Sequence, residues 1–445
     1  MSVSLIVAFV ASWWVTSSQM GPRVLMVYNV DSPMQSYSFD TQNAFELGDV
    51  AEAAKQAKSV KEFYFVIIAE NRIQEPFPIQ ALTEAFSHQP RIKNLTVHAS
   101  QHISDLIPPL ASSEIGGFTY YGVSKTSEIL EALSRPGHPR LTNLKIQSQY
   151  GLPVGPMVFR EDGLRALSLM TELRFVTIVN QGVSDNVAEA FCLRTPVTEL
   201  KLDHNPVTGT FFQEIPASLE RLSLFDCRLR DGTITAPRIS TNLKALDLSD
   251  NQIGDRAIAT ITPSLKRCLR QLWLKRTDIS DSSLECLAQC EELQELDLSQ
   301  CRITRFPHNG FSKLEALDLS ETQINDEALD FIEHLPKLKR LNLGGNCLSD
   351  AAIDRLAKGK ELEYIAIYRT EIDGEALARR MPNAKLWRRG EGFPWIINQS
   401  GAISNDRLGQ GLHVFGGFLM DPQQTDIDPR LKKIPSEPLQ DANKE

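Results

Sequence analysis

The chain has 445 residues, of which 42% are hydrophobic and 23% are charged, and its formal net charge is −9. This composition is typical of a globular chain that can bury a long core, and the negative charge argues against a surface that binds nucleic acid. The seven cysteines are odd in number and include no CxxC pair, which argues against a disulfide framework and against a zinc site.

The first segment, residues 1–22, carries no charge before Arg23. Its most apolar part, Val3 to Val15, suits the core of a signal peptide in length but lacks a basic stretch before it. It is also shorter than the roughly 17–25 residues of a membrane span. Trp13 and Trp14 are of a type that favours a membrane interface. We favour a membrane anchor formed by residues 3–20. The alternatives are a cleaved export signal and a soluble cytoplasmic terminus.

Residues 23–59 are expected to hold an N-terminal strand and a capping helix. The stretch TQNAFELGDVAEAAKQAKS, residues 41–59, has the spacing of an amphipathic helix. Such a helix would cover the apolar end of the first repeat unit.

A repeated pattern fills residues 60–387. In LKALDLSDNQIGD, which starts at Leu243, apolar residues stand at positions 1, 4 and 6 and a small polar residue stands at position 9. LQELDLSQCRIT, LEALDLSETQIND and LKRLNLGGNCLSD repeat this spacing. The thirteen units begin at Val60, Ile92, Ile115, Leu141, Leu173, Val197, Leu219, Leu243, Leu269, Leu293, Leu314, Leu338 and Leu362.

We interpret each unit as a strand, a turn and a helix. Positions 4 and 6 lie two residues apart, so they face the same side of a short strand, and the next unit in register covers them. The residue at position 9 is expected to hydrogen-bond the backbone of the turn. Cys227 and Cys301 occupy that position in two units, which gives them a structural role without redox chemistry.

The outer side of each unit is expected to be helical in most repeats. An aspartate at the start of the outer helix is expected to accept hydrogen bonds from the free amides there, as at Asp255, Asp281, Asp326 and Asp350. Pro and Gly interrupt the helical pattern at Val207 to Ser218 and at Phe306 to Lys313. We expect the outer side to be extended in those two stretches.

The pattern resembles that of the leucine-rich repeat family, L-x-x-L-x-L-x-x-N/C-x-L. The period of about 24 residues resembles that of bacterial members. The resemblance implies an α/β leucine-rich repeat solenoid over residues 60–387, a curved right-handed superhelix of about 13 coils. Its parallel strands would line the concave face and mostly helices the convex face. Residues 388–424 would then form a C-terminal cap or loop, and residues 425–445 a disordered tail.

No catalytic motif, metal-ligand cluster or cofactor-binding loop stands out in the sequence, so the concave sheet is the candidate site. Side chains at positions 3, 5 and 7 of each unit point away from the core. The residues proposed to contact a protein or peptide partner are Phe175, Phe225, Asp247, Trp273, Lys275, Asp297, Asp318, Arg340, Tyr364 and Tyr368.

Trp273 and Lys275, between Asp247 and Asp297, form the first candidate patch. A tryptophan that points to solvent from a strand is a common binding hot spot. Asp297 and Asp318 would be like charges in register, and a cationic partner would relieve their repulsion. Alternatively, Asp-x-Ser is only the usual sequence at these positions of the repeat and has no role in binding.

Tyr364, Tyr368 and Arg340 form the second candidate patch. Arg340 is one unit before Tyr364 in the same row, which would allow a cation–π contact. On the opposite interpretation, the tyrosines pack against GFPWII and support the C-terminal cap.

The leading functional interpretation is a non-enzymatic scaffold that binds a protein or peptide on the concave surface, displayed at a membrane if the first segment is an anchor. The first alternative is a substrate-recognition adaptor that recruits an enzyme through its N-terminal region. The second is an enzyme whose site lies in the ends of the chain, against which stands the lack of a paired acid–base or nucleophile motif.

Overall fold

The computed structural model describes part of the chain. The described residues are 23–29, 37–40, 44–46, 62–69, 91–92, 94–99, 114–121, 129, 133, 140–147, 167–238 and 241–387. Residues 1–22 and 388–445, for which we expect an anchor, a cap and a tail, lie outside them.

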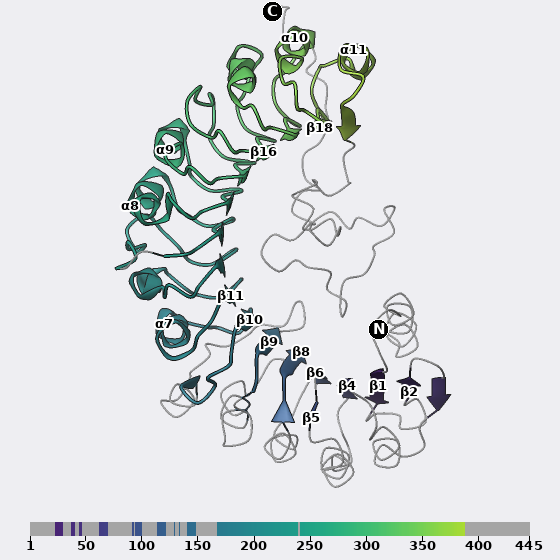
Figure 1. The fold of residues 1–445 in the computed structure, drawn as a ribbon. Coiled ribbons are helices and arrows are strands. Elements are labelled where there is room, and N and C mark those ends of the chain that lie inside the picture. Colours follow the sequence, from purple (N-terminus) through teal and green to yellow (C-terminus); the bar gives the residue numbers. More distant parts are fainter. Residues whose placement is uncertain are drawn as a thin grey trace, which may run out of the picture.

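Thirteen strands of the described residues, one for each predicted unit, pair in parallel in a single sheet. The parallel strands therefore confirm the predicted solenoid, and they line the inner side of an arc (Figure 1). They are β4 (Glu62–Ala69), β6 (Asn94–Ala99), β8 (Gly117–Tyr121), β9 (Asn143–Gln147), β10 (Phe175–Val179), β11 (Glu199–Lys201), β12 (Arg221–Ser223), β13 (Ala245–Asp247), β14 (Gln271–Trp273), β15 (Glu295–Asp297), β16 (Ala316–Asp318), β17 (Arg340–Asn342) and β18 (Tyr364–Ala366).

Further strands extend this sheet at both ends. β19 (Lys385–Trp387) pairs with β18, and β1 (Arg23–Asn29) pairs in parallel with β4. β2 (Tyr37–Asp40) runs antiparallel to β1, and β3 (Ala44–Glu46) runs antiparallel to β2. A separate pair joins β5 (Arg91–Ile92) to β7 (Glu114–Ile115).

The helix expected over residues 41–59 is wrong where the structure describes it. Ala44–Glu46 forms β3 and pairs with β2. The reason is that a strand partner at the sheet edge satisfies the backbone of these residues, and tertiary pairing outweighs helical spacing. Residues 47–59 lie outside the described residues.

Helices form the outer side of the arc in most of the later units (Figure 1). The Val207 to Ser218 stretch, expected to be extended, contains the short 3₁₀-helix η4, so that expectation is wrong; Phe306 to Lys313 has no helix, as predicted. The outer elements are α7 (Asp185–Arg194), η4 (Thr210–Glu214), α8 (Asp255–Leu265), α9 (Asp281–Leu287), η5 (Glu327–His334), η6 (Asp350–Ala352), α10 (Ile353–Leu356) and α11 (Gly374–Arg380).

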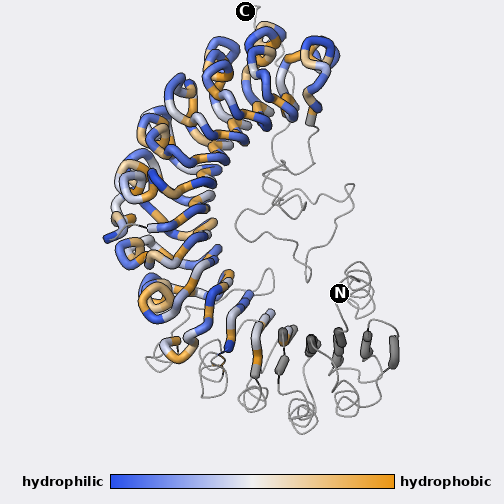
Figure 2. The backbone as a smooth tube through the Cα atoms, viewed as in Figure 1, coloured by the Kyte–Doolittle hydropathy of each residue, from blue (hydrophilic) through white to orange (hydrophobic). Residues whose placement is uncertain are grey.

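The core runs through the coils between the strands and the outer elements. Leu246 and Leu248, at positions 4 and 6 of one unit, are fully buried, and Leu246 is in register with Leu222 on one side and with Leu272 on the other. Figure 2 shows apolar segments in every coil of this region, between more polar inner and outer ends. Each buried leucine contributes about 1.5–3 kcal/mol, so stacking in register stabilises the whole array.

Position 9 hydrogen-bonds the turns as predicted. The Asn251 side-chain oxygen accepts from the backbone amides of Cys227 at 3.1 Å and Leu229 at 3.2 Å. Its Nδ2 donates to the carbonyl oxygens of Leu224 at 2.7 Å and Leu248 at 2.9 Å. Asn251 therefore joins two successive coils.

Cysteine fills position 9 in two units without a disulfide. The Sγ atom of Cys301 lies 3.0 Å from the carbonyl oxygen of Leu274, and that of Cys227 lies 3.3 Å from the carbonyl oxygen of Leu202. Both cysteines are free thiols. Burial raises the pKa of Cys301 to about 11, so the group remains a neutral thiol.

The aspartates near the outer helices do not bond their own helix, and that part of the prediction is wrong. Asp255 accepts from the backbone amide of Ser280 at 2.9 Å and from the hydroxyls of Ser280 and Ser283, all in the next coil. Asp231 likewise accepts from Gly254 at 2.7 Å and Ala257 at 3.1 Å, at the start of α8. The reason is that stacking places the amides of the next coil within reach of each carboxylate.

Candidate binding surface

The inner side of the sheet carries three rows of side chains, at positions 3, 5 and 7. Parallel pairing keeps each row in register from one strand to the next. In the position-5 row the order is Ser223, Asp247, Trp273, Asp297, Asp318 and Asn342.

Trp273 does not point to solvent, and that prediction is wrong. Its exposed fraction is 0%. It clusters with Ala245 and Ala316, apart from the main core of the coils. The small alanines leave space over the sheet for the indole ring. The alternation of a strand assigns a side chain to one face, but it does not show whether that face is open.

Asp297 and Asp318 follow Trp273 in the position-5 row, and these two carboxylates are buried as well. The exposed fraction is 0% for Asp297 and 4% for Asp318. Each accepts hydrogen bonds from the serine two residues later: Ser299 Oγ lies 2.6 Å from Asp297, and Ser320 Oγ lies 2.6 Å from Asp318. The recurring Asp-x-Ser therefore has a structural role, because the serine satisfies the aspartate of its own strand.

Burial changes the charge of Asp318. Asn342 Nδ2 donates to its second oxygen at 2.9 Å. Burial, followed by the neighbouring charge of Asp297, raises the pKa of Asp318 to about 7. Asp247, which precedes Trp273 in the row, is 1% exposed and accepts from the Ser249 amide at 2.9 Å. None of the three predicted carboxylates offers an open acidic surface.

Arg340 is also buried, and its predicted contact with Tyr364 is not formed. The cation over the Tyr364 ring is Lys385, whose Nζ lies 5.6 Å from the ring centre. Arg340 is 8% exposed, in register between Ala316 and Tyr364.

The other five predicted residues are accessible. Phe175 is 43% exposed, and the remaining four are half-buried. The Tyr368 ring lies against Gly344 of the preceding coil, because a Cβ atom added to Gly344 would fall 2.4 Å from the ring. The accessible members of the predicted set are Phe175, Phe225, Lys275, Tyr364 and Tyr368.

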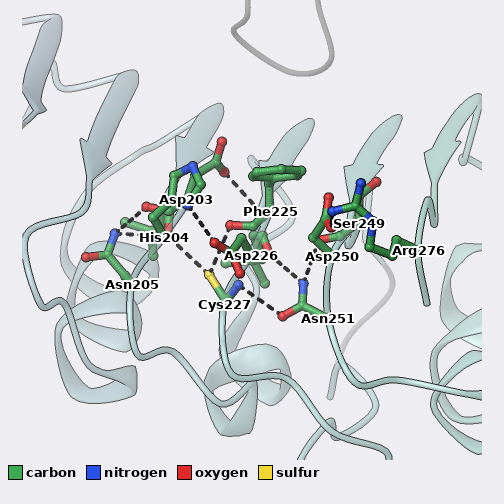
Figure 3. Close-up of polar contacts among 12 residues, drawn as sticks. Asp203, His204, Asn205, Phe225, Asp226, Cys227, Ser249, Asp250, Asn251 and Arg276 are labelled. Carbon is green, nitrogen blue, oxygen red and sulfur yellow. Dashed lines mark hydrogen bonds and ion pairs between the residues drawn. The ribbon is translucent and has the colours of Figure 1, made fainter. Parts of the chain in front are cut away.

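An exposed polar cluster lies beside Phe225, at the turn that follows the strands. His204 Nδ1 lies 2.9 Å from an oxygen of Asp226, and the His204 ring meets the Phe225 ring edge-on at 5.1 Å between centres. Figure 3 shows Phe225 between Asp203 and Ser249, one from each neighbouring coil. This pair was not predicted from the sequence, although Asp226 stands at position 8 of its unit, as His204 does one unit earlier.

Position 8 also carries a hydrogen-bonded row that the sequence reasoning missed. Arg276 lies 2.7 Å from Asp250 and donates to Gln300 at 2.8 Å, and Gln300 donates to Glu321 at 2.7 Å. Glu321 is also 3.6 Å from Arg369. Each of the five residues has a left-handed φ, between 53° and 60°. The sequence signal for this row was weak, because Arg and Glu rarely adopt a left-handed conformation.

The described residues contain no helix that is long and apolar enough to cross a membrane. In the same parts of the chain no group of three or more His, Cys, Asp or Glu is arranged to hold a metal ion.

Comparisons with known proteins place repeats in the same region. A family model described as Leucine Rich repeat matches residues 240–261, 312–332 and 334–357, and a second model of the same description matches residues 292–314. The chain is 26% identical to Tubulin-specific chaperone E of Danio rerio over 200 residues, or 37% of this chain and 38% of that protein. It is 25% identical to human Podocan-like protein 1 over 287 residues, or 58% of this chain and 52% of that protein.

These matches cover less than two thirds of the length of each relative. Among solved structures, an internalin from Listeria monocytogenes has a TM-score of 0.46 and 18% identity, and the match covers 80% of this chain and 94% of that one. A bacterial type of repeat stays a prediction.

Proposed function

The chain is a leucine-rich repeat protein, and from that premise we propose that it is a non-enzymatic scaffold that binds a protein or peptide on the concave side of its sheet. The supporting observation is the set of accessible aromatic side chains on that side, led by Phe175 and Phe225. Aromatic residues bury a large area at a low entropic cost and dominate many interfaces.

The proposed contact surface contains the five accessible residues of the ten that the sequence predicts. Phe175, Phe225 and Lys275 form one part, and Tyr364 and Tyr368 form the other. The His204–Asp226 pair borders Phe225 and supplies a polar rim. Asp247, Trp273, Asp297 and Asp318 are buried, so they are not part of the proposed contact surface.

Proximity crosslinking in cells tests this proposal. The protein is compared with a variant that combines Phe175→Ala and Phe225→Ala. The matched control combines Leu169→Ala and Leu193→Ala. Among the described residues these are the two other large exposed apolar side chains, 55% and 59% exposed, and both lie outside the strands of the sheet. We expect the phenylalanine variant to lose specific neighbours that the protein and the control both retain. Equal capture by all three proteins would contradict a concave binding surface.

Two finer forms of the proposal concern the ends of the chain. In the first, residues 3–20 tether the scaffold to a membrane, and cell fractionation with mapping of the mature N-terminus tests it. In the second, the scaffold is an adaptor whose N-terminal region recruits an enzyme. A ligase, kinase or protease subunit that co-purifies with the protein and is lost when residues 23–59 are exchanged would support the adaptor.

A further inference from the structure

Arg340 has an unusual environment for a charged side chain. It lies on β17, on the concave side, and is 8% exposed. Its Nε and Nη2 atoms are buried and have no hydrogen-bond partner among the described residues. A guanidinium is always charged, and burying it without an acceptor is strongly unfavourable.

Asp318, on the adjacent strand β16, and Glu295, on β15 beyond it, hydrogen-bond to other groups. Asp318 accepts from Asn342 at 2.9 Å and from Ser320 at 2.6 Å. Glu295 accepts from Gln271 Nε2 at 3.0 Å. Among the described residues no ion pair joins the Arg340 guanidinium to a carboxylate.

The two residues in register with Arg340 supply no acceptor for it either. Ala316 has no polar side-chain atom, and it packs against Trp273. Tyr364, on the other side, holds its ring under the Lys385 ammonium group. The acceptor that matches Arg340 therefore has to come from outside the sheet.

We propose that Arg340 anchors a binding site for a carboxylate of the partner. The planar fork of a guanidinium matches a carboxylate with two parallel hydrogen bonds. Asp318 on the adjacent strand β16 and Asp297 on β15 beyond it carry carboxylates on the same side of the sheet, and they disfavour a doubly charged phosphate more than a singly charged carboxylate. This inference rests on the proposed function, because the partner supplies the carboxylate.

The ionisation of Asp318 is compatible with such a ligand. Burial and Asp297 raise the pKa of Asp318 to about 7. Near neutral pH, Asp318 is therefore partly protonated, and an incoming carboxylate meets less repulsion beside Arg340.

Side-chain NMR of the full-length protein tests the site directly. The Nε–Hε signal of Arg340 is assigned by its loss in Arg340→Gln and is then titrated with three short blocked peptides. One carries a glutamate and an amidated end, one has a free C-terminal carboxylate and no acidic side chain, and one carries a glutamine and an amidated end. We expect a saturable shift with either or both of the first two and none with the third. The responding peptide distinguishes a side-chain carboxylate from a chain terminus.

A stability measurement separates this role from a structural one. If Arg340 serves ligand binding, Arg340→Gln removes a buried charge that has no partner in the free protein. The thermal midpoint of the variant is then equal to that of the protein or higher. Peptide binding falls by roughly ten-fold or more. Arg221→Gln is the matched control, because Arg221 also stands at position 3 but is exposed and lies 3.4 Å from Glu199. The control is expected to leave peptide binding unchanged.

Three results would overturn the site: no saturable shift with either carboxylate peptide, an equal shift with the glutamine peptide, or a clear loss of stability in Arg340→Gln. These outcomes are distinct from failure of the proposed function. Peptide binding at Arg340 that persists while the Phe175 and Phe225 variant keeps all its cellular neighbours would retain the site and reject the proposed contact surface.

Discussion

Asp318 stands directly opposite Asp297 on neighbouring parallel strands, and both carboxylates are buried. Two like charges in register oppose each other across the sheet. The structure accommodates them because each accepts a hydrogen bond from the serine two residues later and because Asp318 is partly protonated near neutral pH.

The first prediction concerns the pH dependence of stability. The pKa of Asp318 is about 7 in the folded chain, above its ordinary value of 3.8. Between these two values the folded state holds a proton that the unfolded state releases. The contribution of Asp318 is therefore most favourable below pH 4, and the free energy of unfolding falls as pH rises through about 7. Urea unfolding across that range checks the direction.

Asp297→Asn provides the control for this pH effect. It removes the neighbouring negative charge but keeps a side-chain oxygen for the Ser299 hydrogen bonds. We expect the pKa of Asp318, followed by NMR, to fall while burial keeps it above 3.8. An unchanged pKa would show that the two carboxylates do not interact.

The second prediction concerns Trp273. Because its side chain is fully buried, Trp273→Ala is expected to remove packing and lower the free energy of unfolding by about 3–5 kcal/mol. Lys275 lies two residues later and its side chain is accessible, so Lys275→Ala is expected to change the free energy of unfolding by about 0.5 kcal/mol or less. If Trp273→Ala proved as mild as Lys275→Ala, the burial of the indole would be contradicted.

The third prediction concerns the position-9 bonds that join the coils. Asn251→Ala removes the acceptor of the Cys227 and Leu229 amides and leaves buried polar groups unsatisfied. We expect a loss of about 2–4 kcal/mol, measured by chemical unfolding. Asn251→Thr should cost less, because Thr277 occupies the same position and donates to the Leu274 carbonyl oxygen at 2.6 Å. Equal losses in the two variants would argue against this role.

The fourth prediction concerns the glycine under Tyr368. In Gly344→Ala the new methyl group would lie 2.4 Å from the tyrosine ring, so the ring has to move. We expect a shifted Tyr368 ring signal by NMR and a loss of about 1–3 kcal/mol in the free energy of unfolding. Gly344→Ala combined with Tyr368→Ala should recover part of that stability, and failure to recover it would place the strain elsewhere.

The repeat pattern was sufficient to predict the strands and the position-9 bonds. Leu246 and Leu248 lie two residues apart, as expected for side chains on one face of a strand, and each unit repeats that spacing. The hydrogen bonds of Asn251 were predictable because an asparagine side chain at a turn commonly bonds the backbone of that turn. Each of these inferences depends only on residues close in the sequence.

The remaining features depend on contacts between coils and on what covers the sheet. The position of Trp273 in its strand assigns its face, but its burial depends on packing beyond its own unit. Asp255 bonds Ser280 of the next coil, whereas capping rules consider only its own helix. The His204–Asp226 pair forms between two units and becomes visible only when their positions are aligned.

Site-specific photo-crosslinking tests the central claim most directly. A photoreactive amino acid is placed at Phe225, on the concave side, or at Leu193, which is 59% exposed in the outer helix α7. If the concave side binds the partner, a discrete protein adduct forms from position 225 and is absent or much weaker from position 193. Adducts of equal yield from both positions, or an adduct from position 193 alone, would contradict a concave binding surface.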